Sequence, residues 1–160
     1  MSQNTITATT TVANTIVESG ALISADHGAG YFEVGKREEI ELNGMIAQRA
    51  NPSAILTIRI KYGGVTQVTI TTPANTVILN RQFSLRIQTT VRSIGATGTL
   101  QINGMLNVSG LTVDPSVSAL TVINTTIEQN TTVTFQWGEA SVSDTISVEQ
   151  GRIVCVEPDR

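Results

Sequence analysis

The sequence predicts an all-β protein, a β-sandwich or barrel, and three observations point to that fold class. From Glu38 onward, apolar side chains recur at every second position in run after run, which is the period of a half-buried strand. No segment of helix length shows the 3.6-residue period of an amphipathic helix. Short turns separate about eight to nine such runs, and about 24 of the residues are threonine, which favours pleated surfaces.

The first 30 residues differ from the rest of the chain. They are polar, rich in Thr and Ala and almost uncharged. One interpretation is a first strand over 15–24 behind a frayed tail; the other is an arm that becomes ordered on a partner or a neighbouring subunit. We therefore divide the chain into an extended N-terminal arm, 1–30, and a sandwich domain, 31–160. The apolar arm residues expected to make contacts outside the chain are Ile6, Val12, Ile16, Val17 and Leu22.

The strongest local signal is a hairpin. LTIRIKY (56–62) and VTQVTIT (65–71) both alternate, and Gly63-Gly64 between them suits a tight turn. TTPAN (71–75) then breaks the pattern.

Longer runs lie on both sides of this hairpin. EEIELNGMI (38–46) places Ile40 and Leu42 inward and Glu39 and Glu41 outward. Two alternating arms, FSLRIQTTV and TLQINGMLNV, surround a turn from Gly95 to Gly98. Three later strands are expected in SALTVINTT, TTVTFQWG and DTISVEQGRIVCVE.

Glycines interrupt three of these strands. Gly44 and Gly104 fall at inward positions, which indicates bends or close approach of another backbone. Gly151 indicates a bulge or break in the last strand.

Composition excludes several function classes. A net charge of −3 with scattered Lys and Arg, and only 4% aromatic residues, argues against a nucleic-acid partner. No basic and apolar leader opens the sequence and no apolar run reaches membrane-spanning length, so we expect neither a signal peptide nor a membrane partner. The single cysteine cannot form an internal disulfide.

No group of residues predicts catalysis. His27 is the only histidine, and we interpret it as a solvated loop residue, because a zinc site normally needs three or four protein ligands. A glycosidase pair could be imagined in the acidic run Glu38, Glu39 and Glu41, but a solvated strand face is favoured. Cys155 is expected to be a small structural side chain. We therefore expect no enzyme activity, no catalytic residues, no cofactor and no metal.

Basic residues on the outward strand faces leave two interpretations open. They could pair with carboxylates of a partner, or keep the sheet soluble and its edges protected. These residues are Arg59, Lys61, Arg86 and Arg92.

Four segments resemble β-sandwich virion proteins of tailed bacteriophages, of the capsid cement, decoration and head-fibre type. These are F-V-G at 32–35, the hairpin from Leu56 to Gly64, the run LRIQTTVRSIGATGTLQING from Leu85 to Gly104, and FQWGEASVSDTI from Phe135 to Ile146. The resemblance covers roughly 31–156. It implies a jelly-roll-like antiparallel β-sandwich, assembled as a homotrimer, without a catalytic site.

The function implied is a cement protein on the outer surface of the phage capsid, whose partners are the major capsid protein and its own copies. Broad polar surfaces, an extended arm and many copies suit that role. The alternative is a head-fibre or tail-fibre type module that binds a host-surface carbohydrate, because jelly rolls serve both purposes. We expect a chain lacking 2–24 to stay folded but to bind capsids poorly.

Overall fold

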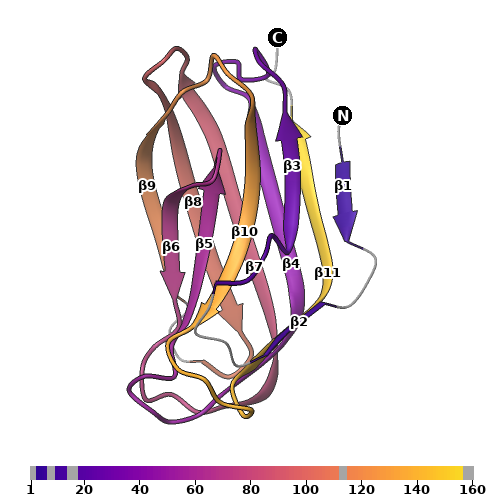
Figure 1. Cartoon of the computed structure of the whole chain (residues 1–160), viewed down its shortest axis with the longest axis vertical. Helices are drawn as coiled ribbons and strands as arrows, with labels where there is room; N and C mark the ends of the chain where they lie inside the picture. Colours follow the sequence, from indigo (N-terminus) through magenta and orange to yellow (C-terminus); the bar gives the residue numbers. More distant parts are fainter. Residues whose placement is uncertain (1–2, 7–9, 14–17, 112–114, 157–160) are drawn as a thin grey trace.

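The structure, a computed structural model, is an all-β sandwich of two antiparallel sheets packed face to face (Figure 1). It describes residues 3–6, 10–13, 18–111 and 115–156. These residues form eleven strands. No helix long and apolar enough to cross a membrane was found among them.

Nine strands make the sandwich itself. The larger sheet has the order β11 (Thr145–Val156), β4 (Arg37–Gln48), β7 (Ile78–Ser93), β8 (Gly98–Val108) and β9 (Ser116–Ile123). The smaller sheet has the order β3 (Ile23–His27), β10 (Gln129–Trp137), β5 (Leu56–Tyr62) and β6 (Val65–Thr71). The strand number and antiparallel sandwich agree with the expectation from sequence.

Strands from early in the chain pair with strands from late in the chain. β4 pairs with β11, β5 with β10, and β7 with β8, as in a jelly roll. Of the other three, β3 pairs with β10, and β6 and β9 lie at the edges of opposite sheets. The Thr121 hydroxyl on β9 donates to the Gln67 side-chain oxygen on β6.

The core lies between the sheets and follows the predicted alternation. β4 and β5 bury every second residue along their length. Trp137, Tyr62 and Phe135 are the largest fully buried side chains. Burying a large apolar side chain stabilises the fold by about 1.5–3 kcal/mol, so these strands carry much of its stability.

Two glycine predictions are confirmed and one is corrected. Gly63 and Gly64 take the positive φ values, 57° and 78°, that a two-residue hairpin turn requires. A Cβ on Gly44 would overlap the carbonyl oxygen of Ser147, so only glycine lets β11 approach here. The irregularity of β11 lies between Val148 and Gln150, where the register with β4 shifts, and Gly151 is paired normally.

The described parts of the first 30 residues contribute strands to both sheets. β1 (Gln3–Ile6) and β2 (Thr10–Ala13) add to the outer edge of β11, and Figure 1 shows β1 beside β11. Residues 23–27, which we assigned to the arm, form β3 and pair with β10. Of the strand expected over 15–24, residues 18–22 are not in a strand, β3 begins at Ile23, and 15–17 lie outside the described residues.

Of the five arm residues, Ile6 and Val12 fall in β1 and β2. Leu22 packs against the core, and its backbone N–H donates to the carbonyl of Val133 at 3.0 Å. Ile16 and Val17 lie outside the described residues.

Candidate functional site

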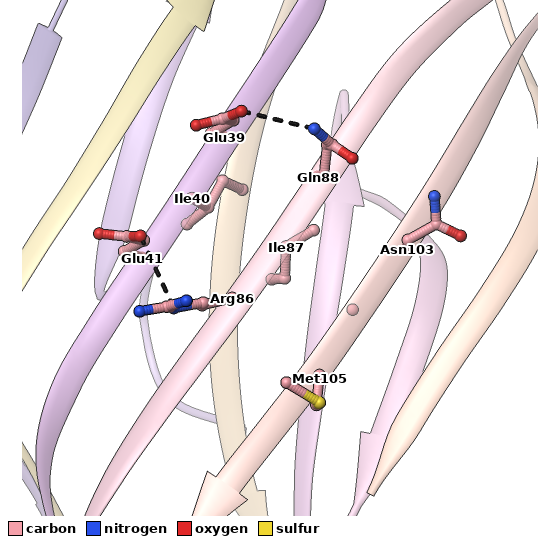
Figure 2. A pocket seen from close by; sticks show the side chains of 9 residues that line it. Glu39, Ile40, Glu41, Arg86, Ile87, Gln88, Asn103 and Met105 are labelled. Atoms are coloured by element: carbon pink, nitrogen blue, oxygen red, sulfur yellow. Dashed lines mark hydrogen bonds and ion pairs between the residues drawn. The ribbon is translucent and has the colours of Figure 1, made fainter.

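The outer face of the larger sheet carries a shallow depression of about 340 Å³ across β4, β7 and β8 (Figure 2). Strand alternation turns polar side chains outward there, while the next residues along each strand point into the core. The lining residues are Glu39, Ile40, Glu41, Arg86, Ile87, Gln88, Asn103, Gly104 and Met105.

Ion pairs cross this face from strand to strand. Arg152, Glu41 and Arg86 are in register on β11, β4 and β7. The Arg152 guanidinium lies 2.7 Å from Glu41 Oε2, and Arg86 Nε lies 3.7 Å from Glu41 Oε1. Gln88 donates to Glu39 Oε1 at 3.4 Å (Figure 2). The predicted outward orientation of Glu39 and Glu41 is confirmed.

Amide and hydroxyl groups continue this surface toward β9. The Ser118 hydroxyl donates to Asn103 Oδ1 at 2.8 Å, and Gln101 Nε2 donates to Ser118 Oγ at 3.2 Å. Beyond them, Leu120 and Val122 on β9 are 64% and 60% exposed. The face therefore offers a partner hydrogen-bonding groups bordered by an apolar edge.

The basic residues of β5 have partners within the chain. Lys61 Nζ lies 2.8 Å from Glu18 Oε1, and Arg59 Nη1 lies 3.8 Å from the same atom. The Thr134 hydroxyl also donates to Glu18. The hydrogen bond with Lys61, and then that with Thr134, lowers the pKa of Glu18. Arg86 likewise pairs with Glu41, so these cations are already engaged in the single chain.

The prediction that His27 is a solvated loop residue was wrong. His27 is the last residue of β3, only 2% exposed, and its side chain points between the sheets. His27 Nε2 lies 2.7 Å from Glu38 Oε2 and 2.8 Å from Thr131 Oγ1. The alternation Ile23, Ala25, His27 is the sequence signal that this residue faces inward.

The prediction that Glu38 lies on a solvated strand face was also wrong. It is 5% exposed and accepts hydrogen bonds from the hydroxyls of Tyr62 at 2.8 Å and Thr131 at 3.2 Å. The Tyr62 hydroxyl also lies 3.0 Å from Thr89 Oγ1. Burial, and then the charge of Glu38, raises the pKa of Tyr62 well above its ordinary value, so its hydroxyl remains a donor.

Cys155 completes this buried cluster. Its side chain is 4% exposed, as expected for a structural residue of the last strand. Its Sγ, a ring nitrogen of His27 and a carboxylate oxygen of Glu38 all lie within 4.8 Å of one another. The three residues come from the last residue of β3, the second residue of β4 and the second-to-last residue of β11. These ends of β3, β4 and β11 lie at the same end of the sandwich (Figure 1). Sequence reasoning did not bring them together.

Aromatic residues cover the cluster. The Tyr31 ring stacks on His27 at 4.2 Å between centroids, and Phe32 meets the His27 ring edge-on at 5.6 Å. Lys36 Nζ lies 3.9 Å from the centroid of Tyr31, whose carbonyl accepts its hydrogen bond at 3.0 Å. The aromatic side chains among the described residues are thus buried or half-buried.

Comparison with known proteins adds a fold-level likeness. No family model matches the chain, and no curated protein sequence matches it. Among solved structures, the metal-free form of lectin I-B4 from Griffonia simplicifolia is similar, with a TM-score of 0.45 and 9% sequence identity. That match covers 84% of this chain and 78% of the lectin chain.

Proposed function

We propose that this protein is a structural component of a tailed-phage virion. In that role it binds the outer surface of the capsid as a homotrimer and stabilises the lattice through contacts with the major capsid protein, without enzymatic activity. The proposal rests on the resemblance of residues 31–156 to phage virion proteins and on the position of the N-terminal strands.

The position of β1 and β2 is the observation that carries the proposal. Both strands add to the edge of β11, outside the nine strands that complete the two sheets. A strand held at a sheet edge by backbone hydrogen bonds can pair equally well with the edge of another chain. The N-terminal segment is therefore suited to join one subunit to its neighbour or to the capsid.

The edge strand β9 supplies a second contact surface, which we assign to the trimer interface. Its outward Leu120 and Val122 are exposed, and its free edge is a template for pairing with another chain. Contact between subunits would cover both features. A Leu120→Lys variant should shift the protein from trimer to monomer in analytical ultracentrifugation, whereas Glu139→Gln, in the loop after β10, should not.

Carbohydrate binding is the alternative, and the described aromatic residues speak against it. Sugar sites usually stack the ligand on an exposed aromatic ring, but Trp137 is fully buried and Tyr31 is held between His27 and Lys36. Specific binding to a glycan array would favour the alternative.

The decisive experiment is cosedimentation with capsids that lack this protein, followed by cryo-electron microscopy of the pellet. Three chains are compared: the full chain, a chain lacking 2–17, and one with 2–17 replaced by a Gly-Ser linker of equal length. The deletion stops at 17 because Glu18, Leu22 and Ile23 contact the sandwich.

We expect the full chain to decorate threefold or quasi-threefold positions and both altered chains to remain folded but bind poorly. Equal occupancy by all three would contradict the role of the arm. No binding to heads by the full chain would contradict the capsid role.

A further inference from the structure

The buried cluster of His27, Glu38 and Cys155 contains the donor types that proteins use for zinc. An imidazole nitrogen, a carboxylate oxygen and a thiol sulfur converge within 4.8 Å, and each residue is less than a tenth exposed. Borderline-soft cations such as Zn²⁺ prefer this combination, whereas Mg²⁺ and Ca²⁺ prefer oxygen ligands.

We propose that His27, Glu38 and Cys155 form a buried binding site for a borderline-soft divalent cation, of which zinc is the best fit. The bound ion would join β3 of the smaller sheet to β4 and β11 of the larger sheet. The site goes beyond the proposed virion role and does not depend on it.

The charge balance of the ligands supports a dication. Thiolate and carboxylate together carry two negative charges, and with a neutral imidazole they compensate Zn²⁺ fully. A neutral complex is what a buried site requires, because burial of net charge is costly. Lys36, the nearby cation, lies on the far side of the Tyr31 ring from His27.

The three ligand atoms lie within 4.8 Å of one another, so they would have to move by up to roughly 1 Å to bind one zinc ion. Zinc–ligand bonds of about 2.0–2.3 Å place neighbouring tetrahedral ligand atoms roughly 3.3–3.7 Å apart. His27 Nε2 and Glu38 Oε2 lie 2.7 Å apart, so they would separate by roughly half an ångström or slightly more.

Glu38 has a cavity beside it, and the Thr131 hydroxyl lies close to the proposed site. A cavity of about 10 Å³ is lined by Glu38 and Tyr62, but not by His27 or Cys155, and it gives the Glu38 side chain room to move. Thr131 Oγ1 lies 2.8 Å from His27 Nε2 and 3.2 Å from Glu38 Oε2, close enough to hydrogen-bond a water molecule that would complete the ligand set.

Neighbouring residues also fix the orientation of the ligands. The hydroxyls of Tyr62 and Thr131 both donate to the Glu38 carboxylate, one to each oxygen. The stacked Tyr31 ring holds the plane of the His27 imidazole. Outer contacts of this kind hold metal ligands in place before the ion arrives.

The test uses the full chain, treated with a chelator and then titrated with Co²⁺. Because Cys155 is the only cysteine, any thiolate-to-cobalt charge-transfer absorption must come from this residue. We expect the absorption to saturate at one Co²⁺ per chain and to disappear when Zn²⁺ displaces the cobalt. Zn²⁺ at about 100 times its Kd should raise Tm by about 5–10 °C.

Two variants separate this site from adventitious binding. Cys155→Ser should abolish the absorption and lower the Zn²⁺ affinity at least about tenfold. Glu41→Gln, on the outer face of β4, the strand that carries Glu38, should change neither. Absence of the absorption from the folded wild-type chain would overturn the site. An increase in Tm with Zn²⁺ that persists unchanged in Cys155→Ser would do the same. If that variant does not fold, the wild-type absorption and its stoichiometry decide alone.

Discussion

Two glutamates of one strand, three residues apart, occupy opposite environments. Glu38 is buried between the sheets and bonded to Tyr62 and Thr131, whereas Glu41 lies on the outer face between two half-exposed or exposed guanidinium groups. Burial raises the cost of losing a polar partner, because water cannot replace it. The same residue type should therefore be structurally essential at 38 and nearly dispensable at 41.

The largest effect is expected from Glu38→Ala. This change removes the acceptor for His27, Tyr62 and Thr131, and loss of one partner from a buried pair costs about 3–5 kcal/mol. Urea denaturation of the metal-free protein measures the loss. A cost below about 1 kcal/mol would mean that the cluster does not support the fold.

Tyr62→Phe should have the next largest effect, about 1–3 kcal/mol, because it leaves the buried Glu38 carboxylate without one donor and the Thr89 hydroxyl without one partner. The pKa of Tyr62 is raised in the folded chain, so the unfolded chain releases this proton first as pH rises. The contribution of Tyr62 is full below the unfolded pKa of about 10 and is lost as pH rises above it toward the folded pKa. The stability difference between wild type and Tyr62→Phe should therefore narrow above about pH 10, and a difference that stays constant would contradict this assignment.

Glu18→Gln tests a carboxylate of intermediate exposure. Glu18 pairs with Lys61 and Thr134, and its pKa is lowered, so its contribution is present above the ordinary value of 4.5 and lost as pH falls through the folded pKa. We expect Glu18→Gln to lower the free energy of unfolding by at most about 1 kcal/mol near pH 7, because solvent screens this partly exposed ion pair. Thermal unfolding at pH 7 and at strongly acidic pH should show the cost only at pH 7.

The smallest effect is expected from Glu41→Ala, the matched control for Glu38→Ala. Arg86 and Arg152 are 70% and 49% exposed, and solvent-exposed pairs contribute about 0–1 kcal/mol. Urea denaturation in low and high salt should detect only a slight difference. A loss as large as that of Glu38→Ala would remove the contrast between the two faces of β4.

The sequence predicted the sheets better than the buried cluster. Alternation identified the hairpin at Gly63-Gly64 and the inward faces of β4 and β5, because burial of one strand face leaves a local period of two. That period also placed Glu38 on the same side as Ile40. Because Glu38 is charged and stands beside two other glutamates, we nevertheless predicted that it faces solvent.

The partners that make Glu38 a buried residue come from distant strands. His27 and Thr131 meet through the pairing of β3 with β10, and Cys155 arrives with β11. Such long-range register leaves no local pattern in a single sequence, so neither the cluster nor its ligand chemistry could be predicted. The N-terminal strands were missed for the same reason, because their pairing with β11 depends on the last strand of the chain.

The pairing of β1 and β2 with β11 also has a kinetic consequence. Within one chain these strands occupy the edge that a second chain would need, with four residue pairs from each strand. A partner must displace them before it can pair there, and it then forms contacts of the same kind that it breaks. Such an exchange would be nearly balanced in free energy, so in the proposed assembly the subunit concentration would set its direction. The strands would then keep free subunits from joining prematurely.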